Sequence, residues 1–118
     1  MRRAQPESEL QQAIVKHLGS RGYHVVHVPN GSKLPGSGEQ RMRTGARLKR
    51  EGLKAGFPDL IVYGHSGRVG HIEVKAPKGR VSPAQEAVAA WLTAWGHNYA
   101  LCRSIDDVTA ALEQWGWA

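Results

Sequence analysis

Apolar residues recur every three or four positions in three parts of the chain, which predicts three amphipathic helices. The first is expected to begin at Ser8, a candidate N-cap with Gln11 three residues later, and to end at Gly19. The other two are expected to follow Ser82 and Ser104. The apolar stripes are formed by Leu10, Ile14 and Leu18, by Ala84, Val88, Trp91, Leu92 and Trp95, and by Ile105, Val108, Leu112 and Trp115.

Four short stretches are expected to form strands, at residues 23–29, 57–64, 69–77 and 98–103, and the first is rich in the β-branched residues that favour them. The second and third are joined by HSGR, which predicts a hairpin of antiparallel strands. A predicted helix separates the third from the fourth, so this pair is expected to be parallel, with a right-handed crossover. We therefore expect a mixed sheet of about four strands.

The segment between the first two predicted strands is polar. Residues 30–41, NGSKLPGSGEQR, hold four glycines and prolines, which favours an exposed, mobile loop. Residues 44–56, TGARLKREGLKAG, are expected to form a short basic helix that ends at Gly56. The predicted order is therefore αβ(α)ββαβα, an α/β sandwich. A chain of 118 residues holds one core, so residues 1–118 are expected to form a single domain.

Charge changes this picture, because basic residues are concentrated in one region. The chain carries a formal net charge of +6, and between residues 33 and 54 seven basic residues accompany only two acidic ones. A clustered basic surface is typical of proteins that bind polyanions, although it can also be a solvated surface that keeps a protein soluble.

Several classes of protein are disfavoured. Cys102 is the only cysteine, so an internal disulfide and a cysteine-rich zinc site are excluded, and its apolar setting predicts a buried strand thiol. The first ten residues lack the apolar core of a secretory signal. The longest apolar stretch, AVAAWLTAW, is too short to span a bilayer. We expect a soluble, intracellular protein that does not associate with membranes.

The chemistry is concentrated in the predicted hairpin. Glu73 and Lys75 are two residues apart in HIEVK, so they point to the same face of the sheet, while Ile72 and Val74 point to the other. Asp59 begins the neighbouring strand, and the hairpin can bring it near Glu73. Each residue taken singly is typical of a solvated strand or a turn. Together they suggest a site, because charges beside apolar strands are costly unless they are paired or bind an ion.

Two carboxylates and a lysine form a suitable set for phosphodiester hydrolysis. Hard oxygen ligands suit Mg²⁺ or Mn²⁺, which also bind phosphate oxygens. A cation so held lowers the pKa of a bound water. The lysine adds a fixed positive charge that can orient the attacking water or stabilise the phosphate.

The chain resembles the PD-(D/E)-x-K nuclease superfamily, and more narrowly the stand-alone VRR-NUC proteins of phages and bacteria. The resemblance rests on ARLKREGLKAGFPDL, HIEVKAPKGRVSPAQ and GHNYALCRSIDDVTAAL, and extends from Glu9 to Leu112. It implies a restriction-endonuclease-like fold. It also implies a metal-dependent DNA endonuclease that acts through a metal-activated water, selects branched, flapped or Holliday-junction DNA, and works as a homodimer.

The resemblance also implies roles for individual residues. Asp59 and Glu73 would bind Mg²⁺ or Mn²⁺ together with the backbone carbonyl of Val74. Lys75 would be the catalytic lysine. Gln85, at the start of the following helix, would contact the metal-bound water or the nucleic-acid backbone.

Other residues are expected to support this site. Glu9 either adds to the metal site or is an ordinary first-turn glutamate that favours the helix dipole. Phosphate contacts are expected from Lys33, Arg41, Arg43, Arg47, Lys49, Arg50, Lys54, Lys78 and Arg80. The alternative hypothesis is a non-catalytic nucleic-acid-binding module that keeps the nuclease fold.

Overall fold

The computed structural model describes residues 6–29 and 36–117. Its elements follow the predicted order. They are α1 (Pro6–Ser20), β1 (His24–His27), α2 (Gly38–Arg50), β2 (Leu60–Tyr63), β3 (Val69–Val74), α3 (Pro83–Ala94), β4 (Asn98–Cys102) and α4 (Ile105–Gln114).

The four strands form one mixed sheet in the order β1-β2-β3-β4. The pairs β1–β2 and β2–β3 are antiparallel, and β3–β4 is parallel. The predicted α/β fold with a four-stranded mixed sheet is therefore confirmed. The hairpin between β2 and β3 and the crossover through α3 together place β3 in the interior of the sheet.

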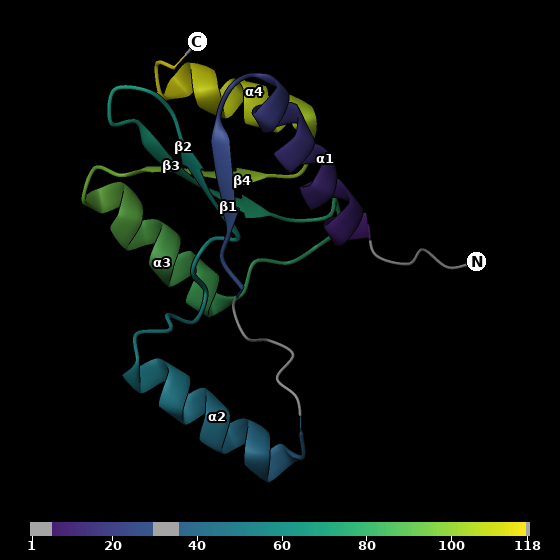
Figure 1. The fold of residues 1–118 in the computed structure, drawn as a ribbon, viewed down its shortest axis with the longest axis vertical. Helices are drawn as coiled ribbons and strands as arrows, with labels where there is room; N and C mark the ends of the chain where they lie inside the picture. The colour runs from purple at the N-terminus through teal and green to yellow at the C-terminus, as the bar shows by residue number, and fades with distance from the viewer. Residues whose placement is uncertain (1–5, 30–35, 118) are drawn as a thin grey trace.

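One face of the sheet carries the main hydrophobic core, which helices α1 and α4 cover (Figure 1). Burial of these side chains stabilises the fold at roughly 25 cal/mol per Å² of apolar surface. The buried members are Ile14, Leu18, Leu60, Val62, Ile72, Val74, Cys102, Val108, Leu112 and Trp117. Helix α3 packs against β4 from the opposite face, with Val88 and Leu92 buried.

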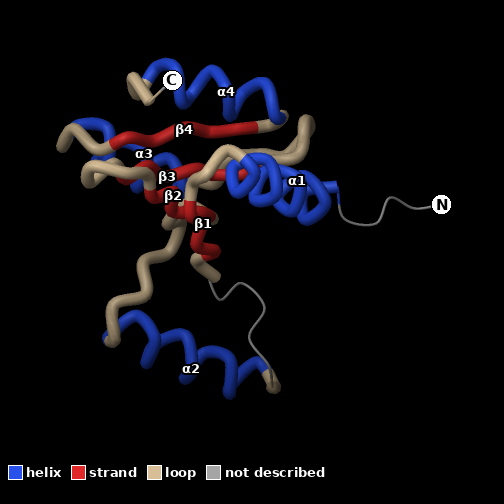
Figure 2. Tube along the Cα trace, turned by 45° about the horizontal axis from the view of Figure 1, so that its top comes forward, coloured by secondary structure: helices blue, strands red, loops and turns tan. Residues whose placement is uncertain are grey.

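Helix α2 stands apart from the rest of the protein (Figure 2). None of its residues is buried, and it contacts no other helix or strand in the described parts of the chain. It begins at Gly38, because the side chains of Ser37 and Gln40 form a capping box. The prediction of a loop over residues 30–41 is therefore wrong for 38–41, and residues 30–35 lie outside the described residues.

The other helix starts agree with the sequence in two cases out of three. Ser82 and Ser104 cap α3 and α4 as predicted. Helix α1, however, begins at Pro6, so Ser8 lies in its first turn and accepts a hydrogen bond from Gln12 Nε2 at 3.3 Å. Proline suits this position because it lacks an N–H that the first turn could not pair. Among the described residues no helix is long and apolar enough to cross a membrane.

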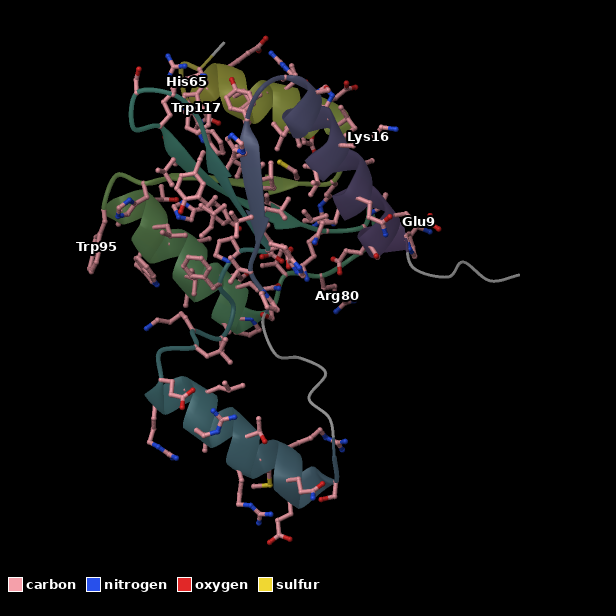
Figure 3. The ribbon with its side chains drawn as sticks, in the orientation of Figure 1. Glu9, Lys16, His65, Arg80, Trp95 and Trp117 are labelled. Atoms are coloured by element: carbon pink, nitrogen blue, oxygen red, sulfur yellow. The ribbon has the colours of Figure 1, made fainter. Side chains whose placement is uncertain are left out.

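The burial of Trp95 differs from the prediction, and the burial of Cys102 agrees with it. Trp95 was expected in the apolar stripe of α3 but is 73% exposed at its C-terminal end (Figure 3). The helix ends there, so its last turn extends past the sheet. Cys102 is buried as predicted, and burial raises the pKa of its thiol to about 12.

Candidate active site

The register of the hairpin sets Asp59 directly opposite Glu73 on the neighbouring strand. Leu60 pairs with Ile72, so the next position along both strands sets Asp59 opposite Glu73. Residues paired across antiparallel strands point to the same face. Leu60 and Ile72 point into the main core, so the two carboxylates point to the other face, which carries α3.

Asp59 is held by hydrogen bonds to both neighbouring segments. Its Oδ2 atom accepts from the backbone N–H of Val74 at 2.8 Å. Its backbone carbonyl accepts from the N–H of Val28 at 2.7 Å. Pro58, directly before it, is buried and has no N–H to satisfy. The carboxylate therefore has a fixed position beside β3.

Glu73 is almost completely buried, with 2% of its surface exposed. Its Oε2 atom accepts a hydrogen bond from Gln85 Nε2 at 2.9 Å and lies 4.0 Å from the ammonium group of Lys75. Its Oε1 atom is buried and has no hydrogen-bond partner among the described residues. An ionised carboxylate with a buried, unpaired oxygen is costly, so this oxygen would take up either a proton shared with Asp59 or a cation.

The ionisation of Glu73 reflects this setting. Burial, followed by the negative charge of Asp59 and by a hydrogen bond that the protonated carboxyl can form with Asp59, raises its pKa from 4.5 to about 8, while the charge of Lys75 acts in the opposite direction. Two carboxylates this close repel each other when both are ionised. A divalent cation between them would offset the repulsion.

Gln85 has two hydrogen-bonding roles. Its Oε1 atom accepts from the N–H of Ser82 at 2.9 Å, and the Ser82 hydroxyl accepts from the N–H of Gln85 at 3.1 Å. This capping box fixes which end of the amide faces Glu73, because the oxygen is already used. The amide nitrogen is therefore directed at the carboxylate.

Gly56 allows the loop before Asp59 to touch the start of α3. A Cβ atom at this position would overlap the backbone of Ala84 and Gln85, and its φ of +82° also favours glycine. The glycine thus lets the segment that leads to Asp59 approach the helix turn that carries Gln85.

The acidic residue of α1 whose charge acts on Glu73 is Glu7, which is itself exposed. Its negative charge contributes to the raised pKa of Glu73. Glu9 is exposed and lies on the outer side of α1 (Figure 3), so the structure does not bring it to the other carboxylates. Helical spacing could have identified Glu7, because it lies three residues before Leu10 and seven before Ile14.

The predicted phosphate-binding residues that the structure describes are exposed and fall into two groups. Lys54 and the five residues of α2 lie on the segment that leads to β2, and Lys78 and Arg80 lie in the loop after β3 (Figure 3). Lys33 lies outside the described residues. The five residues of α2 are Arg41, Arg43, Arg47, Lys49 and Arg50.

The residues present fit a hard divalent cation. The carboxylates of Asp59 and Glu73 offer oxygen ligands, and Glu73 Oε1 is unpaired. The described residues contain no group of three or more His, Cys, Asp or Glu side chains that could hold a metal ion. Mg²⁺ commonly needs only one or two carboxylates and completes its shell with water and substrate phosphate.

A mixed sheet that sets Pro58-Asp59 beside Glu73-Val74-Lys75 is the arrangement of the PD-(D/E)-x-K nucleases. Residues 5–106 match the VRR-NUC domain, so the chain belongs to this family of PD-(D/E)-x-K-type nucleases. The resemblance found in the sequence is confirmed.

Comparison with solved structures supports the fold. A chain described as "VRR_NUC domain protein" superposes with a TM-score of 0.67 at 24% sequence identity, covering 92% of this chain and 85% of that one. At this identity the likeness shows the fold alone. Among curated proteins, none matches this chain.

Proposed function

We propose that this protein is a Mg²⁺- or Mn²⁺-dependent DNA endonuclease that hydrolyses phosphodiester bonds in branched, flapped or junction DNA. The main supporting observation is the buried, unpartnered Oε1 atom of Glu73, directly across the strand pair from Asp59 and beside Lys75. A divalent cation would pair this oxygen and would offset the negative charge of both carboxylates. The cluster instead suits a cation.

In this proposal Asp59, Glu73 and the carbonyl of Val74 would hold the cation. When bound, it supplies a Lewis acid for the scissile phosphate and acidifies a water molecule. Gln85 donates to Oε2 of Glu73, which leaves Oε1 as the oxygen that would hold the cation. Glu7 adds negative charge from α1, which increases the attraction for a divalent ion.

Lys75 would act on the reacting phosphate. Its ammonium group is largely buried beside Glu73, so water screens its charge weakly. A fixed positive charge at this position orients the attacking water or stabilises the negative charge that develops on the phosphate. It needs no proton transfer to do so.

The basic residues of α2 and of the loop after β3 would hold the DNA. Phosphate contacts of this kind position a duplex without reading its sequence. In a homodimer, two copies of the site would act on two strands, which is the arrangement that a four-way junction requires. Sedimentation velocity with and without junction DNA would establish the number of copies.

The proposal is tested by a cleavage panel on duplex, single-stranded, flapped and four-way-junction DNA with Mg²⁺, Mn²⁺ or EDTA. We expect cleavage with either metal, none in EDTA, and a preference for a branched substrate. DNA binding without cleavage of any substrate would support the non-catalytic alternative. Equal cleavage of all four substrates would contradict the structure-selective part.

A further inference from the structure

The guanidinium group of Arg103 binds the turn that follows the lysine strand. Its Nη1 atom donates to the backbone carbonyls of Ala76 at 2.7 Å, Gly79 at 2.9 Å and Pro77 at 3.2 Å. In the described parts of the chain the guanidinium makes no ion pair. The nearby Asp107 carboxylate accepts a hydrogen bond from the backbone N–H of Arg103. The charge is thus directed at three carbonyls of one turn.

The parallel register explains why Arg103 reaches this turn. Val74 pairs with Cys102, so one step further along both strands sets Arg103 beside Lys75. The chain then turns over residues 76–79, where the N–H of Gly79 donates to the carbonyl of Ala76 at 2.9 Å. Arg103 therefore binds a turn that begins at the residue after Lys75.

The same turn passes close to the side chain of Lys75. A Cβ atom at Gly79 would lie 3.4 Å from Lys75 Cδ and 3.3 Å from the carbonyl oxygen of Ala76. The turn therefore lies next to the aliphatic part of Lys75, whose ammonium group lies 4.0 Å from Glu73. A displaced turn would alter the surroundings of this side chain.

We propose that Arg103 is a positioning residue that holds the turn 76–79 and, through it, the side chain of Lys75. The inference rests on the proposed function, because Lys75 is the lysine that would act on the phosphate. Arg103 contacts neither the carboxylates nor the reacting atoms. A misplacement of about 1 Å at a reacting group can cost about 100-fold in rate.

The test compares Arg103→Ala with Arg68→Ala, which removes an exposed arginine from the hairpin at the other end of β2 and β3. Trypsin cleavage after Lys78 and Arg80 is followed by mass spectrometry, with cleavage after Arg50 as the internal reference. Single-turnover DNA cleavage in Mn²⁺ and DNA affinity in EDTA are measured on the same proteins.

For Arg103→Ala we expect faster trypsin cleavage at the turn, a single-turnover rate lower by about 10- to 100-fold, and a DNA dissociation constant within about threefold of wild type. Arg68→Ala should match wild type in all three. In a Lys75→Ala background, Arg103→Ala should add no further loss of rate, because residues that act as a unit are not additive.

Unchanged trypsin protection, faster trypsin cleavage with an unchanged rate, or a full additional loss in the Lys75→Ala background would each overturn the inference. If Arg103→Ala does not fold, Arg103→Lys replaces it, and a rate that falls while the turn stays protected would overturn the inference. A wild-type protein that cuts no DNA would overturn the proposed function instead, and trypsin would still decide whether Arg103 holds the turn.

Discussion

At the scale of single residues, Glu73 is the residue of the site whose burial most opposes folding. It is the buried charged residue of the described chain, and its pKa is raised to about 8 by burial and by Asp59. Burying a carboxylate in this way opposes folding unless a cation or a proton neutralises it. The fold would be more stable without this charge, which the proposed chemistry would require.

The raised pKa predicts how stability depends on pH in metal-free protein. Between pH 4.5 and about 8 the unfolded chain loses the Glu73 proton while the folded protein keeps it. The free energy of unfolding therefore falls as pH rises through this window, and changes little from this group outside it. Glu73→Gln removes the effect, so in EDTA its melting temperature should exceed that of wild type by a growing margin from pH 5 to pH 8.

Glu9→Gln is the matched control, because Glu9 is an exposed carboxylate on α1. Its melting temperature should follow wild type at every pH. Adding Mg²⁺ at pH 8 should stabilise wild type and not Glu73→Gln, because a ligand that binds only the folded state raises its stability. A constant difference between Glu73→Gln and wild type from pH 5 to pH 8 would contradict the assigned cause.

Sequence reasoning recovered the residues whose positions depend on local rules. Strand alternation placed Glu73 and Lys75 on one face, the hairpin placed Asp59 opposite, and the capping box placed Gln85 at the start of α3. The choice of Glu9 overlooked Glu7, two residues earlier on α1, whose charge acts on Glu73.

At the scale of elements, α2 is unusual because nothing in the described chain covers it. A helix of 13 residues gains little stability on its own in water. Its ion pairs Arg43–Glu39 and Arg47–Glu51 are exposed and contribute little. The basic surface of α2 is therefore accessible for binding a polyanion.

This exposure predicts that α2 acts through phosphate contacts. Lys49→Ala/Arg50→Ala removes two exposed charges and keeps good helix formers. We expect weaker DNA binding, with a log–log salt dependence less steep by about 1 to 2, and an unchanged melting temperature. Affinity measured by fluorescence anisotropy between low and moderate salt checks this.

Lys16→Ala/Arg21→Ala removes the same charge from the exposed side of α1, where Lys16 lies (Figure 3), and from the turn after this helix, where Arg21 is exposed. It should leave the salt dependence close to that of wild type. Equal changes in both double variants would show that only net charge matters, and would contradict a role for α2.

The start of α2 could not be read from apolar periodicity, because its first residues are polar and none of its side chains is buried. The feature of the sequence that could have indicated this start is the capping box formed by Ser37 and Gln40. For Trp95 the apolar periodicity predicted burial that the structure does not show. Helical spacing says which residues share a face of a helix, but not how far the sheet extends beneath that face.

At the scale of the whole molecule, the order of elements was predictable because each hydrophobic pattern reports one element and short connections limit the topology. The contacts of Arg103 were not predictable, because they join β4 to the turn after β3 and depend on the parallel register. Pairings between segments distant in sequence leave no local pattern.

The sheet brings Asp59, Glu73 and Lys75 together from two strands, and the central claim is that this cluster cleaves DNA. The most direct measurement is single-turnover cleavage in Mn²⁺ by wild type and Lys75→Ala, with DNA affinity in EDTA and Lys16→Ala as the control. We expect Lys75→Ala to lose at least about 100-fold in rate with affinity within about threefold of wild type, and Lys16→Ala to match wild type. Equal cleavage by Lys75→Ala and wild type would contradict the account.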